Sequence, residues 1–296
     1  MACGASSRHN GMAEAWTVRS LLQWARDWLA KKGVENPRLD AELLLAHALR
    51  CDRVRLYIDA DKPLAAEELA RFKPLIKRRG ALEPVAYILG TKEFYGRPFA
   101  VAAGIFIPRP ETELLVRMVT EHFARDAEAR VLDLCAGSGA VGISIAAERP
   151  RARVDLVELS ADAAAMARAN AEKHAPGRVR VVTGDLYAVL PEKVRYDAIA
   201  ANPPYVPTAE VGRLAPDVIQ HEPHIALFAG EDGLAVIRRI VAGVGEWLAP
   251  GGLFVTEIDP SQGEAVAHLL RDAGLMQVRV ERDLAELDRH VAGRRA

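Results

Sequence analysis

From Arg130 onward, short apolar segments alternate with segments of helical periodicity. Strands are predicted at 130–134, 153–158, 179–183, 196–200, 253–258 and near 277–281, and helices begin at Val141, Ala161, Leu234 and Gly263. This alternation indicates a parallel sheet covered by helices on both faces. We therefore predict an α/β, Rossmann-like domain with strand order 3-2-1-4-5, in which the first and fourth strands are neighbours.

The residues before this region carry helical signals instead. Apolar side chains recur at helical spacing from Val18 to Leu29, with Thr17 placed to cap the helix and Gly33 to end it. Further helices are predicted at 38–50 and 65–79. We therefore expect a small N-terminal helical bundle at 12–84, preceded by a disordered tail or leader at 1–11.

A different pattern separates the two regions. Residues 85–90 and 93–101 read as two short strands that turn at Gly96, so 85–105 is predicted to be a β-hairpin linker. Pro110 and Glu111 are suited to the first turn of a helix. The α/β domain is accordingly expected to span 106–296.

Composition narrows the class of protein. No apolar run of the 296 residues approaches the roughly 20 needed to span a bilayer. The three cysteines, Cys3, Cys51 and Cys135, are far apart and form no cluster with histidines, so neither a disulfide framework nor a zinc site is indicated. We expect a cytoplasmic protein that has no membrane partner and requires no metal.

The most specific chemical signal is the tetrad Asn202, Pro203, Pro204 and Tyr205, which directly follows the predicted strand at 196–200. The two prolines stiffen the backbone in an extended form. The Asn202 side-chain oxygen and the Pro203 carbonyl are thereby fixed as two neighbouring acceptors. They suit a planar NH2 group, such as a carboxamide or the exocyclic amine of adenine or cytosine.

A glycine-rich turn follows the first strand. Gly137, Gly139 and Gly142 satisfy the pattern G-x-G-x-x-G, and Glu158 ends the next strand, where it can accept hydrogen bonds from ribose hydroxyls. Asp185, which closes the third strand, is either a partner of an adenine amine or a turn residue. These features predict a nucleoside cofactor, and both NAD and S-adenosylmethionine fit them.

The expected strand order places this turn beside the tetrad. Methyl transfer to nitrogen needs a nucleoside cofactor next to a group that holds NH2, whereas hydride transfer needs an acid or base at a carbonyl. His221 and His224 are the histidines nearest in sequence, and their segment reads as a loop. We favour a methyltransferase; a nicotinamide-dependent oxidoreductase and a non-enzymatic binding module remain the alternatives.

Together these motifs resemble the HemK/PrmC family of peptide chain release factor glutamine N5-methyltransferases, over about residues 84–262. The stretches that carry the resemblance are Pro84-Val-Ala-Tyr-Ile-Leu-Gly, Glu93-Phe-Tyr-Gly, Phe106-Ile-Pro-Arg-Pro-Glu-Thr-Glu, Val131-Leu-Asp-Leu-Cys-Ala-Gly-Ser-Gly, Asn202-Pro-Pro-Tyr and Glu222-Pro-His-Ile-Ala-Leu-Phe-Ala-Gly-Glu-Asp-Gly-Leu. The tetrad alone is shared with DNA adenine and RNA guanine methyltransferases. The stretch that begins at Phe106 is more specific to enzymes that act on release factors.

The resemblance implies a helical domain that grips a release factor, a hairpin linker and a Rossmann-like S-adenosylmethionine-dependent methyltransferase domain. Its substrate would be the glutamine of the Gly-Gly-Gln loop. The cofactor-binding residues would be Cys135, Ala136, Gly137, Ser138, Gly139, Glu158, Asp185, Leu186 and Asn202. The catalytic residues would be Asn202, Pro203, Pro204 and Tyr205, and Phe106 and Arg109 would join them in binding substrate.

The sequence departs from the family pattern at three places. Leu186 stands where some members carry a large aromatic residue, Glu257-Ile-Asp259 replaces Glu-Ile-Gly, and the segment 284–288 lacks a usual glycine. These departures fall at the wall of the adenine site and at the last strand.

The charge distribution bears on the choice of methyl acceptor. Residues 12–90 carry 14 Lys and Arg against 11 Asp and Glu, a net +3, whereas residues 91–296 carry 24 against 29, a net −5. A catalytic region of this sign would bind a phosphate backbone weakly at physiological salt. We therefore expect a protein substrate with no direct nucleic-acid partner, acted on by a monomeric enzyme.

Overall fold

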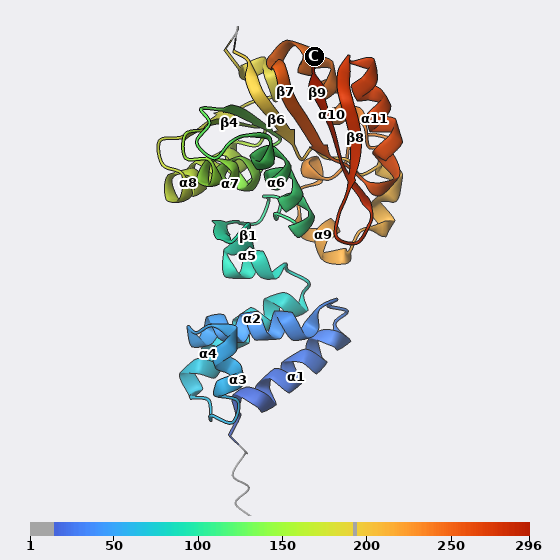
Figure 1. The fold of residues 1–296 in the computed structure, drawn as a ribbon. Helices are drawn as coiled ribbons and strands as arrows, with labels where there is room; N and C mark the ends of the chain where they lie inside the picture. The colour runs from blue at the N-terminus through green and yellow to red at the C-terminus, as the bar shows by residue number, and fades with distance from the viewer. Residues whose placement is uncertain (1–14, 192–193) are drawn as a thin grey trace, which may run out of the picture. The chain divides into compact units, whose positions relative to one another are not determined.

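The computed structural model describes residues 15–191 and 194–296, and the predicted tail or leader at 1–11 lies outside them. The chain divides into two compact units, Met1–Leu89 and Gly90–Ala296 (Figure 1).

The first unit is a helical bundle. Its helices are α1 (Val18–Lys31), α2 (Pro37–Leu49), α3 (Arg53–Ile58), α4 (Ala66–Gly80) and α5 (Val85–Leu89). The side chain of Thr17 accepts a hydrogen bond from the backbone N–H of Ser20 and so caps α1, as its position predicted. Leu29, Leu44, Leu45 and Phe72 are buried in the core that these helices share.

The segment Val85–Leu89 is helical, so the prediction that it forms a strand of the hairpin was wrong. Its apolar residues pack as one helical turn, and Ile88 is buried in the core of the bundle. A short apolar run is compatible with either structure, and here the tertiary contacts decide.

The hairpin itself is shorter than predicted and consists of β1 (Thr91–Phe94) and β2 (Arg97–Ala100). Tyr95 and Gly96 form its turn with φ of 50° and 69°, the left-handed pair that matches the twist of a two-residue hairpin. Phe94 and Phe99 are buried in the core of the second unit. The hairpin is thus packed into the second unit.

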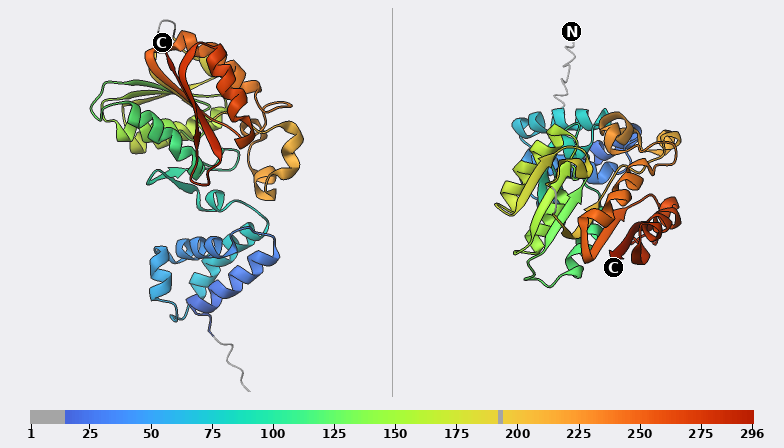
Figure 2. Two further views of the ribbon diagram at one scale, coloured as in Figure 1. Left: turned by 45° about the vertical axis from the view of Figure 1, so that its right-hand side comes forward. Right: turned by 90° about the horizontal axis from the view of Figure 1, so that it is seen from above.

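The second unit is built on one mixed sheet (Figures 1 and 2). Its strands are β3 (Arg130–Leu134), β4 (Arg153–Glu158), β5 (Val179–Thr183), β6 (Tyr196–Ala201), β7 (Leu248–Glu257), β8 (Leu275–Arg282) and β9 (Asp288–Arg295). They lie in the order β5-β4-β3-β6-β7-β9-β8. The five strands from β5 to β7 are parallel and confirm the predicted 3-2-1-4-5 order, with β3 beside β6.

The expectation that all strands of the sheet are parallel was wrong at the end formed by β9 and β8. The sequence pattern missed β9, which lies between β7 and β8 and pairs with both in antiparallel fashion. In β9 the buried apolar residues are Val291 and Ala292, and charged residues occupy both ends, so the strand lacks the mostly apolar composition of β3 and β6. The strand β9 is instead held by backbone pairing with β7 on one side and β8 on the other.

Helices cover both faces of the sheet. Those of the second unit are α6 (Glu113–His122), α7 (Ala140–Glu148), α8 (Ala161–His174), α9 (Pro216–His221), α10 (Ala235–Trp247) and α11 (Gly263–Asp272). One apolar core lies under α6, α7 and α8, and a second lies under α10 and α11. The helix predicted from Pro110 begins as the single 3-10 turn η1 (Pro110–Thr112), which leads into α6. Within the part of the chain that the structure describes, no helix is long and apolar enough to cross a membrane.

Candidate active site

A cavity of about 800 Å³ opens at the carboxyl ends of β3, β4 and β6. Ligands bind at this position in open parallel sheets because the connections diverge there. The predicted residues that line the cavity are Phe106, Arg109, Cys135, Ala136, Gly137, Ser138, Glu158, Asp185, Leu186, Asn202, Pro203, Pro204 and Tyr205. The fold therefore brings the two predicted halves of the site together, although their motifs are more than sixty residues apart in sequence.

Gly139 does not line the cavity. It has a φ of 81°, and a Cβ atom built there would lie 2.6 Å from Cδ1 of Ile143, which is too close for any side chain. A Cβ atom on Gly142 would lie 2.2 Å from Cδ2 of Leu156 and 2.9 Å from Oδ2 of Asp133, so at both glycines a larger residue would force its neighbours to move. These two glycines thus allow α7 to pack closely on the sheet, whereas Gly137 faces the cavity.

Glu158 holds the glycine-rich turn in place. Its carboxylate accepts hydrogen bonds from the backbone N–H groups of Gly137 and Ser160, both at 2.8 Å. A carboxylate has about four acceptor positions, so two N–H donors do not exhaust it. Glu158 can both order the turn and accept hydrogen bonds from a ligand in the cavity that it lines.

Asp133 is a buried carboxyl group beneath the turn to which the sequence analysis gave no role. It is 1% exposed and accepts a 2.8 Å hydrogen bond from the N–H of Gly142. Burial raises the pKa of Asp133 from 3.8 to about 7, and the nearby negative charge of Glu158 acts in the same direction. Its position in the segment Val131–Gly139, directly before the glycines, was the available signal.

The raised pKa of Asp133 makes a prediction about stability. Between pH 4 and 7 the folded state binds a proton at Asp133 that the unfolded state has lost, so this group lowers the free energy of unfolding as pH rises. In Asp133→Asn this contribution is absent. The stability of the parent relative to the variant should therefore decrease from pH 4 to pH 7, as measured by denaturant unfolding at several pH values. A constant difference across that range would contradict the assignment.

The region of the predicted adenine site contains a residue that the sequence analysis missed. Arg239, on α10, lines the cavity and forms an ion pair with Asp185 at 2.7 Å. Leu186 is buried in the same wall. The aromatic residue that follows it, Tyr187, stacks on Trp247 in the core with ring centroids 5.7 Å apart. Arg239 is 54 positions from Asp185, and no local pattern connects the two residues.

The tetrad is fixed by contacts on both sides. The side-chain nitrogen of Asn202 donates a 3.2 Å hydrogen bond to the hydroxyl of Thr112, a buried residue of η1. This contact uses the amide nitrogen and leaves the amide oxygen free to accept from a ligand. The hydroxyl of Tyr205 donates to Oε1 of Glu257 at 3.0 Å. Thr112 thus connects the stretch that begins at Phe106 to the tetrad.

Arg109 is engaged within the protein although it lines the cavity. It forms an ion pair with the buried carboxylate of Glu222, and its guanidinium lies 4.9 Å from the centre of the Phe106 ring. Glu222 also accepts a 3.2 Å hydrogen bond from the N–H of Ile107. Two of the family-like stretches, which begin at Phe106 and Glu222, are therefore joined through one buried carboxylate.

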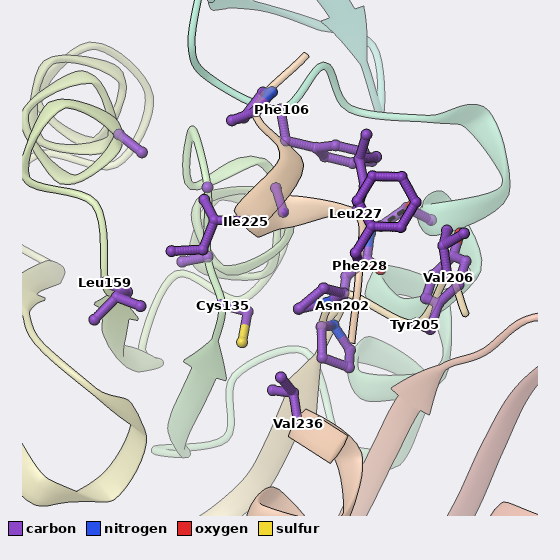
Figure 3. A pocket seen from close by; sticks show the side chains of 18 of the residues that line it. Phe106, Cys135, Leu159, Asn202, Tyr205, Val206, Ile225, Leu227, Phe228 and Val236 are labelled. Carbon is purple, nitrogen blue, oxygen red and sulfur yellow. Dashed lines mark hydrogen bonds between the residues drawn. The ribbon is translucent and has the colours of Figure 1, made fainter. Parts of the chain in front are cut away.

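The remaining wall of the cavity is largely apolar. Figure 3 shows Phe106, Ile225, Leu227 and Phe228 on one side of Asn202 and Val236 on the other. Val206 pairs with Phe228 in an isolated parallel bridge, which ties the segment after the tetrad to this wall. The sequence analysis did not identify the apolar residues 225–228 as lining, because their spacing resembles that of ordinary core residues.

Two protein-family models match the chain. Residues 20–90 match the PrmC N-terminal domain, and residues 108–225 match the methyltransferase small domain. Among solved structures, a methyltransferase from Pyrococcus furiosus is similar with a TM-score of 0.51, 16% identity and coverage of 76% of this chain and 98% of that one. The Thermus thermophilus 16S rRNA N2 G1207 methyltransferase in complex with AdoMet and guanosine is similar with a TM-score of 0.50, 21% identity and coverage of 70% and 50%. At these identities the two structures support the fold alone.

Curated relatives are similar over nearly the whole chain. The release factor glutamine methyltransferase of Geobacter sulfurreducens is 44% identical over 281 residues, which are 95% of this chain and 98% of the relative. The enzyme of the same name from Burkholderia pseudomallei is 43% identical over 86% of this chain and 91% of the relative. These similarities confirm the resemblance drawn from the motifs: the chain belongs to the release factor glutamine methyltransferase family.

Proposed function

We propose that the protein transfers the methyl group of S-adenosylmethionine to the side-chain amide nitrogen of the glutamine in the Gly-Gly-Gln loop of peptide chain release factors. The observation that carries this proposal is the position of Asn202. Its amide is oriented by Thr112, and it lines the same cavity as Gly137 and Glu158. Family membership favours methyl transfer over the oxidoreductase and the binding module that the motifs left open.

The residues of the cavity fit the cofactor. The turn at Gly137 allows close approach of a ligand, Glu158 has acceptor capacity for ribose hydroxyls, and Leu186 and Val236 offer an apolar wall for a base. Arg239 covers the same region through its pair with Asp185. When bound, the sulfonium supplies an electrophilic methyl group.

The contribution of the chain to the reaction is positioning. A carboxamide nitrogen is a poor nucleophile, but it can attack while neutral and lose its proton afterwards. The Asn202 oxygen and the Pro203 carbonyl would accept its two N–H hydrogens and so fix the direction of the nitrogen. Fixed geometry of this kind can supply several kcal/mol, about 7 to 11 in the most favourable intramolecular cases.

The cavity and its surroundings favour a protein acceptor. The wall formed by Phe106, Leu227 and Phe228 is apolar, which suits a loop of uncharged residues that enters from a folded partner. The net charge of −5 in residues 91–296 opposes a nucleic-acid backbone. The tetrad also suits an adenine amine, so the acceptor must be tested directly.

The deciding experiment supplies labelled S-adenosylmethionine with four possible acceptors: a purified release factor, the same factor with its loop glutamine replaced, DNA that contains adenine, and RNA. We expect label on the release factor that depends on the loop glutamine. Efficient labelling of a nucleic acid with none on the protein would overturn the proposal.

We further propose that the helical unit binds the body of the release factor through an aromatic stripe, which consists of Trp16, just before α1, and of Trp24 and Trp28 on α1. Trp16 and Trp24 are 39% and 42% exposed. The rings of Trp24 and Trp28 stack with centroids 5.9 Å apart, and Lys32 lies 5.5 Å from the centre of Trp28. Exposed tryptophans beside a cation are typical of the few residues that dominate binding at protein interfaces.

The stripe makes a prediction with a matched control. Trp24→Ala should raise the KM for whole release factor about tenfold, because losing one interface anchor commonly costs more than 1 kcal/mol, and should leave kcat unchanged. Ile58→Ala removes an apolar residue that is 68% exposed on α3 of the same unit and should have no such effect. Equal KM values for the two variants in a steady-state methylation assay would contradict a role for the stripe.

A further inference from the structure

A buried polar cluster lies behind the tetrad and consists of Tyr205, Glu257 and His290. The Tyr205 hydroxyl donates to Oε1 of Glu257 at 3.0 Å, and Nε2 of His290 lies 3.6 Å from Oε2 of Glu257. Glu257 is 1% exposed at the end of β7, and His290 is 0% exposed on β9. The cluster therefore connects the antiparallel end of the sheet to the catalytic segment.

Stability alone does not account for this carboxylate. Glu257 sits at the edge of the apolar core formed by residues such as Phe254, Ile258 and Val291. Within residues 15–191 and 194–296, its Oε2 atom has no hydrogen-bond partner, and neither ring nitrogen of His290 has one. A buried carboxylate costs several kcal/mol of desolvation, and apolar residues of similar volume often serve a core better. The hydrogen bond to Tyr205 is the contact that distinguishes Glu257.

Tyr205 is held at its backbone as well. The side-chain nitrogen of Gln262 donates to the Tyr205 carbonyl at 2.9 Å. A Cβ atom on Gly233 would lie 2.1 Å from the same carbonyl oxygen, so Gly233 leaves just enough room for it. The residue is thus fixed at its hydroxyl by β7 and at its carbonyl by the 3-10 turn η5 (Pro260–Gln262).

The position of Tyr205 is transmitted to the acceptor atoms by a stiff backbone. Pro203 and Pro204 have fixed φ angles and leave little freedom between Asn202 and Tyr205. Movement of Tyr205 would therefore shift the Pro203 carbonyl, whereas Thr112 holds the side chain of Asn202 separately. An error of about 1 Å in such an arrangement can lower the rate a hundredfold.

We propose that Glu257 is a positioning residue for methyl transfer, acting through the Tyr205 hydroxyl to hold the Pro203 carbonyl against the acceptor amide. This inference rests on the proposed function and adds a residue outside the tetrad to it. Glu257 touches neither cofactor nor acceptor; it sets the geometry of the group that does.

The experiment uses the whole chain, S-adenosylmethionine and a purified release factor. Tyr205→Phe and Glu257→Ala should each lower kcat about tenfold, the range of one lost hydrogen bond to a charged group, while the calorimetric Kd for the cofactor stays within twofold. The double variant should lose no more than either single variant, because the two side chains act as one unit. Glu257→Gln retains an acceptor oxygen and should restore kcat to within about threefold of the parent.

A second buried tyrosine provides a matched control. The Tyr196 hydroxyl donates to Oδ2 of Asp155 at 2.7 Å, both residues are buried, and Tyr196 begins β6, at the opposite end of the strand from the tetrad. Tyr196→Phe removes the same kind of hydrogen bond. It should lower the free energy of unfolding and leave kcat unchanged.

The outcomes separate the two hypotheses. If the parent labels no release factor, the proposed function fails, and the inference fails with it. If the parent is active but Tyr205→Phe loses no more kcat than Tyr196→Phe, the inference alone is overturned. The comparison of Tyr205→Phe with Tyr196→Phe, each of which removes one hydroxyl group, still decides the question if Glu257→Ala does not fold.

Discussion

Replacing Asn202 by alanine is expected to lower kcat for release factor methylation a hundredfold or more. The variant loses one of the two acceptors that we propose fix the amide hydrogens, and removal of one preorganised polar contact commonly costs about 10² to 10³ in turnover. The side chain is half-buried and donates a hydrogen bond to Thr112, a contact outside the apolar cores of the unit, so the fold should survive. Steady-state kinetics with a purified release factor measures the effect, and circular dichroism checks the fold.

Thr112→Val is the matched control for this change. It removes the hydroxyl that orients Asn202 but leaves the acceptor itself in place. We expect a loss of about tenfold or less, the range of a single neutral hydrogen bond. Normal turnover in Asn202→Ala would contradict the proposed mechanism. A larger loss of kcat in Thr112→Val than in Asn202→Ala would show that the Thr112 hydroxyl acts on the substrate directly.

Glu158→Ala is expected to weaken S-adenosylmethionine binding by about 1.5 to 3 kcal/mol, the range of hydrogen bonds to a charged group. The change removes the proposed acceptor for ribose hydroxyls and also releases the N–H groups of Gly137 and Ser160. Both effects act on the Kd for the cofactor, which titration calorimetry measures. The KM for the release factor should change little, because the acceptor half of the cavity is untouched.

Two further variants serve as controls for the effect of Glu158→Ala on cofactor binding. Glu158→Gln retains an oxygen that can accept from Gly137, so it should fall between the parent and the alanine variant. Asp162→Ala removes an exposed carboxylate from the first turn of the helix that follows, α8, and should leave the Kd unchanged. An unaltered Kd in Glu158→Ala would remove this residue from the cofactor site.

The central part of the fold could be predicted from the sequence because its strands are buried on both faces. The strands that contain Leu132, Leu156 and Ile199 are short, mostly apolar and largely buried, although each includes one aspartate, and this is the pattern of a parallel sheet under helices. The glycine turn and the tetrad each follow such a strand, so their meeting at one edge follows from strand order alone.

The remaining features depend on contacts that no local pattern encodes. Asp52 caps α3 by accepting from the N–H of Arg55, but the helix is six residues long and too short for a periodic signal. The pairs Asn202–Thr112 and Arg239–Asp185 join residues 90 and 54 positions apart. Such polar partners come together only when the chain folds. The motif residues could therefore be predicted from the sequence, but the residues that hydrogen-bond to them could not.

The position of β9 has a consequence for the order of folding during synthesis. The ribosome releases β8 before β9, yet in the sheet β8 pairs with β9 alone. Until β9 emerges, β8 has no hydrogen-bonded neighbour, and the edge of β7 that pairs with β9 in the finished sheet carries unpaired backbone groups. An unpaired edge is a template for association with other chains. The nascent protein should therefore be most prone to aggregation in the interval between the emergence of α11 and that of β9, and a chaperone that covers this edge would act in that interval.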